Sequence, residues 1–357
     1  MRRIPSRCLK KDSVVATDVY DGDFKLLIKK NSKVNEKTIE ALKRFNIISV
    51  YIIDEYSNEE LDEIIGIELR LKAAKELKDM AYEFKQKKMN TVREDYVERI
   101  KVTVNEIIDE LIYEKKLLLQ QIDIRNVENY NFLHSVNVTI MSIVLGIKLD
   151  YDRAKLEKIG LAAMLHDIGK VFVPKELLFK ENRTKEEENA VRYHCEAGYN
   201  YLSKFKNVDE KIKNVVLQHH ELIDGSGYPK RLKGNQIDEF SRIIGVADFY
   251  DRVMASGYML GDNLPSDILE QIMAYSNSAF DFEIVRTFFG IAKPFLEGSI
   301  VKLNNGDVAI VKGTIKGMPL RPIVKVIRSD KEERIGGYVD LSMKLDVTIV
   351  KILYYID

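Results

Sequence analysis

The sequence predicts a mainly α-helical protein, with a helical core between a small α+β N-terminal module and a β-rich C-terminal tail. Apolar residues recur at helical spacing from about residue 57 to residue 293. Before residue 56 and after Pro294, short segments alternate apolar and polar residues instead, as strands do. All five histidines fall within the helical region, which makes that region the expected place for a functional site.

Composition narrows the class of protein. Of the 357 residues, 45% are hydrophobic, which is enough for two or three domains with proper cores. Lys plus Arg and Asp plus Glu both total 56, so no basic field indicates a nucleic-acid partner. No apolar run approaches the roughly 20 residues of a membrane span. The cysteines, Cys8 and Cys195, match no disulfide or metal spacing and indicate free thiols, so we expect a cytoplasmic protein without a membrane span.

Four parts follow along the chain. Residues 1–56 form the N-terminal module, with a DGD turn at 21–23 and a helix from about Asn35. Residues 57–123 are an amphipathic helical connector; a solvated role is the simpler interpretation, and a homodimer through these helices is the alternative. Residues 124–293 form the main helical domain, which contains all five histidines. Residues 294–357 form the β-rich C-terminal extension, with a hairpin signal, NNGD, at 304–307.

Taken singly, several of the candidate residues indicate little. His134 lies on a strongly apolar helical segment, NFLHSVNVTIMSIVLG, where a core histidine without a ligand role is common. His166 and Asp167 end another apolar helix, and an unpaired buried carboxylate there would be costly. Cys195 follows His194 by one residue, about 100° around a helix, so we assign the thiol no role.

Taken together, these residues predict a metal centre. His219 and His220 end the helix NVVLQHH beside a Gly-rich turn, and Asp248 interrupts the apolar stretch RIIGVADFYD. All the histidines plus two acids exceed what one tetrahedral ion takes, and a carboxylate such as Asp167 can bridge two ions. Imidazole with carboxylate and no thiolate favours two divalent first-row ions, iron or manganese, over structural zinc.

The motifs HDIGK at 166–170 and HHELIDGSGYP at 219–229 resemble those of the HD-GYP phosphodiesterases, a subgroup of the HD-domain metal-dependent phosphohydrolases. His134 upstream and Asp248 downstream fit the same pattern. The resemblance spans about residues 125–260 and extends more weakly to both ends. It implies a helical HD-type metal-binding core and hydrolysis of the bacterial second messenger cyclic di-GMP, to pGpG and/or GMP, by a nucleophile that two metal ions activate.

The resemblance also assigns roles to residues. Lys170 and Asp167 are the implied catalytic residues, and Lys170 would stabilise charge that develops on the phosphoryl group. An exposed helix-end cation is the alternative role for Lys170. One metal would be held by His134, His166, Asp167 and Asp248, and a second by Asp167, His194, His219 and His220.

A loop beside the histidine pair carries the remaining candidates. Gly225 and Gly227 can adopt positive φ at little steric cost and so turn the chain. In the family this loop is thought to contact the substrate or GGDEF domains, whereas Tyr228 fits a plain packing role equally well. The implied substrate-binding or loop residues are Asp224, Gly225, Gly227, Tyr228, Pro229 and Arg252.

The sequence departs from the family pattern in ways that leave three hypotheses open. Tyr130 stands where family members with a third metal carry a Glu, which favours two metals. The segment DRVMASGYMLGDN lacks most of the basic residues that usually hold the substrate phosphates, although Arg252 remains. The chain is therefore a cyclic di-GMP phosphodiesterase, a phosphohydrolase of another cyclic dinucleotide or nucleotide, or a non-enzymatic adaptor that binds GGDEF or effector proteins.

Overall fold

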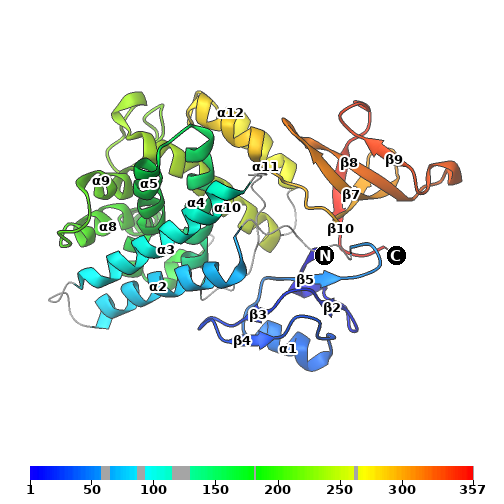
Figure 1. Cartoon of the computed structure of the whole chain (residues 1–357), viewed down its shortest axis with the longest axis horizontal. Helices are drawn as coiled ribbons and strands as arrows, with labels where there is room; N and C mark the ends of the chain where they lie inside the picture. The colour runs from blue at the N-terminus through cyan, green and yellow to red at the C-terminus, as the bar shows by residue number, and fades with distance from the viewer. Residues whose placement is uncertain (58–64, 87–92, 115–128, 181, 261–263, 357) are drawn as a thin grey trace.

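The computed structural model describes residues 1–57, 65–86, 93–114, 129–180, 182–260 and 264–356. A helical body lies beside two smaller β-containing parts, one formed by the start of the chain and one by its end (Figure 1). This arrangement confirms the predicted fold class. The domain boundaries after residues 56, 123 and 293 stay predictions.

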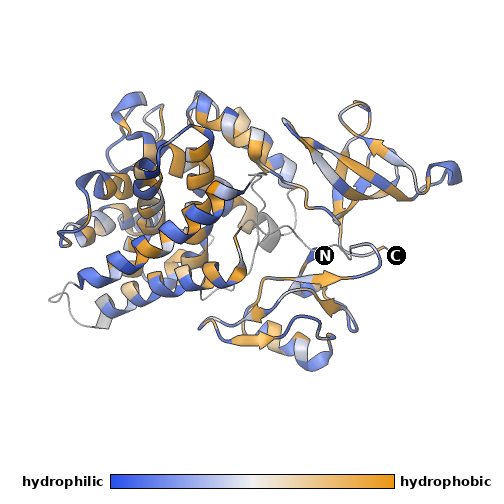
Figure 2. Cartoon of the chain, viewed as in Figure 1, coloured by the Kyte–Doolittle hydropathy of each residue, from blue (hydrophilic) through white to orange (hydrophobic). Residues whose placement is uncertain are grey.

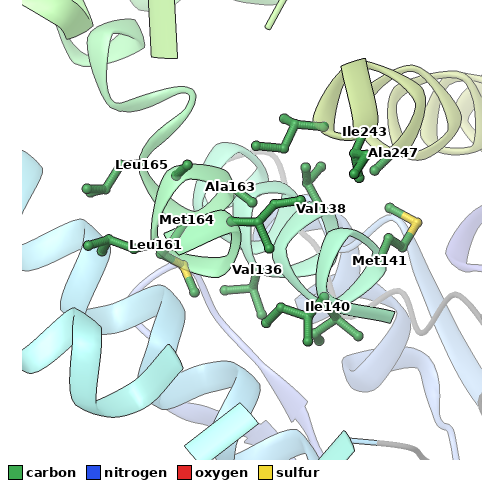
Figure 3. Close-up of a cluster of buried hydrophobic side chains, with 14 of the residues drawn as sticks. Val136, Val138, Ile140, Met141, Leu161, Ala163, Met164, Leu165, Ile243 and Ala247 are labelled. Atoms are coloured by element: carbon green, nitrogen blue, oxygen red, sulfur yellow. The ribbon is translucent and has the colours of Figure 1, made fainter. Parts of the chain in front are cut away.

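The helical body has a buried helix, α4, at its centre. Apolar side chains of α4 pack on the neighbouring helices, and Val138 lies toward Ile243 of α10 (Figure 3). Hydropathy follows the packing, because apolar residues line the helix faces that meet one another (Figure 2). The longer helices of the body are α2 (Ile67–Gln86), α3 (Glu94–Tyr113), α4 (Tyr130–Lys148), α5 (Arg153–Leu165), α7 (Lys185–Arg192), α8 (His194–Leu202), α9 (Glu210–Gln218), α10 (Glu239–Leu260), α11 (Pro265–Ala274) and α12 (Phe282–Ile291). Two short helices, η2 (Ile168–Phe172) and α6 (Lys175–Leu178), join α5 to α7.

Helix α4 corrects one expectation. Its residues Tyr130–Lys148 are long and apolar enough to cross a membrane, although we expected no such segment. However, 78% of its apolar window is buried inside the protein. A helix that other helices cover on most sides is apolar around its circumference for that reason alone.

The helices α2 and α3 differ from the expected solvated connector. Leu77 and Met80 of α2 and Ile100 and Val104 of α3 are buried in the same apolar cluster as α4 and α5. The amphipathic pattern correctly predicted helices, but their apolar faces pack on the rest of the helical body and are not exposed to solvent. A homodimer through these helices would have to use their other faces, and it stays a prediction.

The N-terminal module is built on a three-stranded antiparallel sheet with the order β1-β5-β2. These strands are β1 (Arg2–Pro5), β2 (Val14–Val15) and β5 (Ser49–Ile53), and β3 (Val19–Tyr20) pairs with β4 (Leu26–Ile28) in a separate hairpin. Helix α1 (Glu36–Arg44) starts where expected, because the Asn35 side chain accepts a hydrogen bond from the Thr38 N–H and caps it. Strand β1 was not predicted.

The C-terminal part is a five-stranded antiparallel sheet with the order β10-β6-β7-β8-β9. The strands are β6 (Ile300–Leu303), β7 (Val308–Ile315), β8 (Met318–Arg328), β9 (Tyr338–Asp340) and β10 (Ile349–Leu353). The predicted NNGD hairpin joins β6 to β7, and Gly306 there adopts a positive φ of 92°.

The two ends of the chain meet. Arg2 Nη1 donates a hydrogen bond to the Tyr354 carbonyl oxygen at 2.5 Å, and the Lys10 N–H donates to the Tyr355 hydroxyl at 3.0 Å. Tyr354 and Tyr355 also pack on the apolar cluster of the N-terminal module. Both termini therefore lie at the junction of the two β-containing parts (Figure 1).

Candidate metal centre

The predicted ligand residues come together in the helical body although they are spread over more than a hundred positions. Each lies at a helix end or on a helix that faces the centre of the body. His134 projects from α4, His166 and Asp167 follow α5, His194 begins α8, His219 and His220 follow α9, and Asp248 lies on α10. All of them except His220 are buried.

A close backbone approach brings two of these segments together. A Cβ atom on Gly169 would lie 1.9 Å from the His194 carbonyl oxygen and 2.6 Å from the Gly198 nitrogen. Only glycine allows η2 to pack so closely on α8. The contact therefore fixes Asp167, which precedes η2, beside His194.

The Asp167 carboxylate divides its two oxygens between two groups of histidines. Its Oδ2 lies 3.5 Å from His134 Nε2 and 3.4 Å from His166 Nε2. Its Oδ1 lies 3.3 Å from His194 Nε2 and 3.7 Å from His219 Nε2. A carboxylate in this position can bridge two cations.

Asp248 is the second buried acid of the cluster. Its Oδ1 lies 3.1 Å from His134 Nε2, and its Oδ2 lies 3.6 Å from His220 Nδ1. Arg252, one helical turn further along α10, places Nη2 2.8 Å from the same Oδ2. Arg252 thus contacts the cluster directly. The sequence lacks the usual phosphate-binding arginine after this helical turn, and the side chains of residues 256–263 there lie outside the described residues.

Hydrogen bonds orient the histidine rings. The Nδ1 atoms of His166, His194 and His219 lie 2.6, 2.7 and 2.7 Å from the carbonyl oxygens three residues earlier. A carbonyl can only accept, so Nδ1 carries the proton in each ring. The lone pair is then on Nε2, the atom that points toward the carboxylates, and this is the tautomer that a metal ligand needs.

His134 is oriented by a carboxylate that the sequence analysis missed. Its Nδ1 lies 2.7 Å from Oδ2 of Asp251, which is fully buried. Asn137 Nδ2 donates to Asp251 Oδ1 at 3.1 Å, and Arg70 Nη1 donates to Asn137 Oδ1 at 2.8 Å. This chain ties His134 to helix α2. The available signal was a second acid one turn after Asp248 on an apolar helix.

Replacing Asp251 by Asn is expected to lower metal affinity about 10- to 100-fold, because carboxylates that orient a ligating histidine contribute this much. Titration of the metal-free protein with zinc or manganese, using a competing chelator, measures the change. The exposed Asp109, which pairs with Arg153 on the surface, provides the matched control Asp109→Asn. Unchanged metal affinity in Asp251→Asn would show that the carboxylate serves packing alone.

The protonation states favour cation binding. Burial alone would raise the pKa of Asp167, but the Lys170 ammonium and the His166 ring hold it well below its usual range. Burial lowers the pKa of His219 and His220 well below the ordinary histidine value, and neighbouring rings act in the same direction. At neutral pH the Asp167 carboxylate is therefore ionised and the His219 and His220 rings are neutral. At His134, burial alone would lower the pKa, but the Asp248 and Asp251 carboxylates raise it.

Unsatisfied buried atoms show that this donor set fits metal ions. Among the described residues, His166 Nε2 and Asp167 Oδ1 are buried without a hydrogen-bond partner, whereas Asp248 Oδ2 is paired with Arg252. Buried polar atoms that lack a partner are costly unless an ion or water satisfies them. Two sets of three, His134–His166–Asp248 and His166–Asp167–His219, have potential ligand atoms within 4.8 Å of one another. These nitrogen and oxygen donors suit divalent first-row metals.

Lys170 lies where the sequence placed it. Its Nζ forms an ion pair with Asp167 Oδ2, and its side chain is 13% exposed. Lys170 and Asp167 also line a cavity of about 120 Å³. The alternative of an exposed helix-end cation is therefore wrong, since Lys170 is largely buried against the candidate centre.

The loop after the histidine pair is held by Glu221, which the sequence analysis did not single out. The buried Glu221 carboxylate accepts hydrogen bonds from the N–H groups of Lys230 at 2.6 Å and Leu232 at 2.9 Å. Gly225 adopts the expected positive φ, 84°. The expectation for Gly227 is wrong, because it is needed for close packing: a Cβ there would lie 2.4 Å from the Leu222 nitrogen.

The other loop candidates take different positions. Asp224 is exposed and accepts hydrogen bonds from the Ser226 N–H and hydroxyl, so it shapes the turn. The Tyr228 ring lies 4.8 Å from the His220 ring, and the Arg192 guanidinium lies 4.8 Å from the Tyr228 centroid. Tyr228 therefore packs directly on a candidate ligand.

Cys195, to which the sequence analysis assigned no role, lies beside the candidate ligands. Helix α7 ends at Arg192 and α8 begins at His194, so His194 and Cys195 lie at a helix junction where the regular 100° separation does not decide their directions. Cys195 Sγ lies 3.5 Å from His194 Nε2.

The candidate centre lies within a region that matches a known family. Residues 112–284 match a family model described as an HD domain, and residues 300–355 match one described as a KOW domain associated with HD domain. The cyclic di-GMP phosphodiesterase PA4108 of Pseudomonas aeruginosa is 32% identical over 232 residues, which cover 64% of this chain and 56% of the relative. The 3'3'-cGAMP-specific phosphodiesterase 2 of Vibrio cholerae is 33% identical over 134 residues, 37% of this chain and 26% of the relative.

A further relative and a solved structure extend the comparison. The cyclic di-GMP phosphodiesterase PdeB of Borreliella burgdorferi is 29% identical over 201 residues, 56% of this chain and 52% of the relative. The chain thus spans about half the length of the first of these curated relatives. Bd1817, an HDG"Y"P protein from Bdellovibrio bacteriovorus, has the same fold, with a TM-score of 0.52 at 18% identity over 80% of this chain and 97% of that one. The chain therefore contains one region that matches the HD domain and another that matches the KOW domain associated with it, and its sequence is similar to those of curated cyclic dinucleotide phosphodiesterases.

Proposed function

We propose that this chain is a metal-dependent phosphodiesterase that hydrolyses a cyclic dinucleotide, with cyclic di-GMP as substrate and pGpG and/or GMP as product. The observation that carries the proposal is the Asp167 carboxylate, which lies between two groups of buried histidines. The names of the relatives, cyclic di-GMP and 3'3'-cGAMP phosphodiesterases, support the substrate class.

The side chains would share two metal positions. His134, His166 and Asp248 would hold one ion, His194, His219 and His220 the other, and Asp167 both. When bound, two divalent cations of this kind supply a nucleophile from water at neutral pH and neutralise charge on phosphoryl oxygens. Iron and manganese are the ions that we expect from the imidazole and carboxylate donors.

Lys170 would act on the substrate phosphate. Its ammonium, held at the edge of the Asp167 carboxylate, lies at the floor of the 120 Å³ cavity. A cation fixed in a partly buried site stabilises negative charge that develops on a phosphoryl oxygen more than a mobile surface cation does. The cavity is also lined by aromatic side chains, among them Tyr82, Phe132 and Phe179, which offer surfaces for a nucleobase.

Replacing Phe179 by Ala tests this placement of a base. Phe179 is 38% exposed, so the variant should fold. Stacking of a base on an aromatic ring contributes about 1 to 3 kcal/mol, so KM should rise roughly 5- to 100-fold while kcat changes little. Steady-state kinetics with saturating metal measure both constants. The matched control is Phe282→Ala, because Phe282 is a comparably exposed ring on α12, which the cavity lining does not include. An unchanged KM would place the base elsewhere.

A second substrate is favoured by a specific observation. Arg252 is engaged with Asp248, and the chain lacks most of the basic residues usual after that position. A mixed cyclic dinucleotide such as the cyclic GMP–AMP of the Vibrio relatives' names is therefore the runner-up. A non-enzymatic adaptor for GGDEF proteins is less well supported, because a docking surface needs no buried cluster of histidines and carboxylates.

The deciding experiment combines metal analysis with a substrate panel. Protein purified without oxygen and supplied with iron or manganese is expected to hold about two ions per chain. The loaded protein is then assayed with cyclic di-GMP, cyclic GMP–AMP and cyclic di-AMP. If only the mixed dinucleotide is cleaved, it replaces cyclic di-GMP as the proposed substrate. If the protein binds two ions but cleaves none of the three dinucleotides, the adaptor function is favoured.

A further inference from the structure

Cys195 lies within the second group of histidines. Its thiol is fully buried, and Sγ lies 3.5 Å from His194 Nε2. His194 Nε2 in turn lies 3.3 Å from His219 Nε2. The potential ligand atoms of His194, Cys195, His219 and His220 all lie within 4.8 Å of one another.

The distances match the edges of a coordination tetrahedron. Zinc binds imidazole nitrogen at about 2.0 to 2.1 Å and thiolate sulfur at about 2.3 Å, so tetrahedral ligands are separated by about 3.3 Å for two nitrogens and about 3.6 Å for nitrogen and sulfur. The observed separations are 3.3 Å and 3.5 Å. The separation of Sγ from His194 Nε2 is thus the one expected for two ligands of a single ion.

An independent observation indicates a cation at the same atoms. Asp167 Oδ1, buried and without a hydrogen-bond partner among the described residues, lies 3.3 Å from His194 Nε2 and 3.7 Å from His219 Nε2. The same two nitrogens therefore face an unsatisfied carboxylate oxygen on one side. The sulfur lies beside His194 as a further donor.

We propose that Cys195 is a thiolate ligand of the second metal position, which makes that position a mixed histidine and sulfur site. This inference rests on the proposed metal centre. When the sulfur–metal bond forms, the thiol proton leaves to solvent, and no oxidant or other reactant is needed. A neutral thiol that only donates a hydrogen bond to His194 is the competing interpretation.

The consequence is a different metal preference at the two positions. Thiolate is a soft donor and favours zinc or cobalt, whereas imidazole with carboxylate also suits manganese. The position at His134, His166 and Asp248 has no sulfur within its group. The second position should therefore prefer a thiophilic ion, in contrast to the iron or manganese that the sequence alone favoured for both.

Cobalt(II) substitution tests the proposal without any activity measurement. The cobalt-loaded full chain should show a sulfur-to-cobalt charge-transfer band in the near ultraviolet, and Cys195→Ser should abolish it. Cys195→Ala provides a second variant in case serine is poorly tolerated in the buried position. The chain has only one other cysteine, Cys8, so Cys8→Ser is the matched control and should keep the band.

Two further measurements quantify the bond between Cys195 and the metal. X-ray absorption of the zinc-loaded protein should show a sulfur neighbour at about 2.3 Å that is absent in both Cys195 variants. Zinc affinity of the second position should fall at least tenfold in these variants, since even the outer partners of metal ligands contribute about 10- to 100-fold. Circular dichroism checks that the variants remain folded.

The outcomes separate this proposal from the proposed function. Two cobalt ions per chain without a charge-transfer band, or a band that persists in Cys195→Ser and Cys195→Ala, would overturn the thiolate ligand and leave the dinuclear centre intact. No bound cobalt in the wild type would overturn both. A band that disappears only in the Cys195 variants, with cobalt still bound at the first position, supports the thiolate.

Discussion

Asp167→Asn is expected to lower the turnover of a cyclic dinucleotide by at least about a thousandfold, because the transition-state stabilisation by two cations amounts to several kcal/mol and each 1.36 kcal/mol is a factor of ten in rate. The carboxylate oxygens face both groups of histidines, so an amide would weaken both positions together. The amide nitrogen would also place a donor where a cation needs an acceptor. Metal content and kcat should therefore fall in parallel.

Elemental analysis and initial rates measure this effect on the same samples. Asp209→Asn is the matched control, because Asp209 caps helix α9 at the surface and asparagine caps equally well. A variant at position 167 that keeps two ions per chain and full turnover would refute the bridging role. Loss of one ion with partial turnover would show that the carboxylate serves one position only.

Lys170→Ala is expected to lower kcat about 100- to 1,000-fold while both metal ions stay bound. Loss of one fixed group that stabilises transition-state charge has this magnitude. Lys170 contacts Asp167 Oδ2 but is not itself a ligand, so the expected pattern is a change in kcat without a change in metal content. This pattern distinguishes it from Asp167→Asn.

Lys170→Arg sharpens the interpretation, because it keeps the charge and changes the geometry. Partial recovery of kcat would assign the effect to charge, and no recovery would assign it to position. Lys158→Ala is the control on the preceding helix, where Lys158 pairs with Asp209 at the surface. Loss of metal from Lys170→Ala would show instead that the ammonium maintains the Asp167 carboxylate.

The sequence singled out the candidate ligand residues that the structure brings together, because their types and positions are local signals. The HD pair at the end of a helix and the HH pair before a glycine-rich turn each indicate buried polar side chains at a point where the chain changes direction. Asp251 and Glu221 were within reach for the same reason, as acids beside Asp248 and His220. Arg70 was not, because its link to His134 through Asn137 joins segments that only the folded chain brings together.

The periodicity of apolar residues predicted which segments form helices and strands, but not which of these segments pack together. The amphipathic pattern of α2 and α3 gave the helices but not the partner of their apolar faces. Gly227 shows a similar limit: a glycine in a turn predicts a positive φ, yet here the neighbouring backbone leaves no room for a Cβ. The nearness of Cys195 to His194 Nε2 could not be predicted, because no glycine or proline marks the break between α7 and α8.

The meeting of the chain ends has a consequence for folding. Arg2 and Tyr354 are 352 positions apart, so their contact closes a loop that contains nearly the whole protein. The free-energy cost of closing a loop grows only with the logarithm of its length, by about 0.6 kcal/mol for each doubling. Even this long loop therefore adds little to the cost of the contact. Contacts of high sequence separation nevertheless form slowly. We therefore expect the helical body to fold first, from its more local contacts, and the two β-containing ends to dock last.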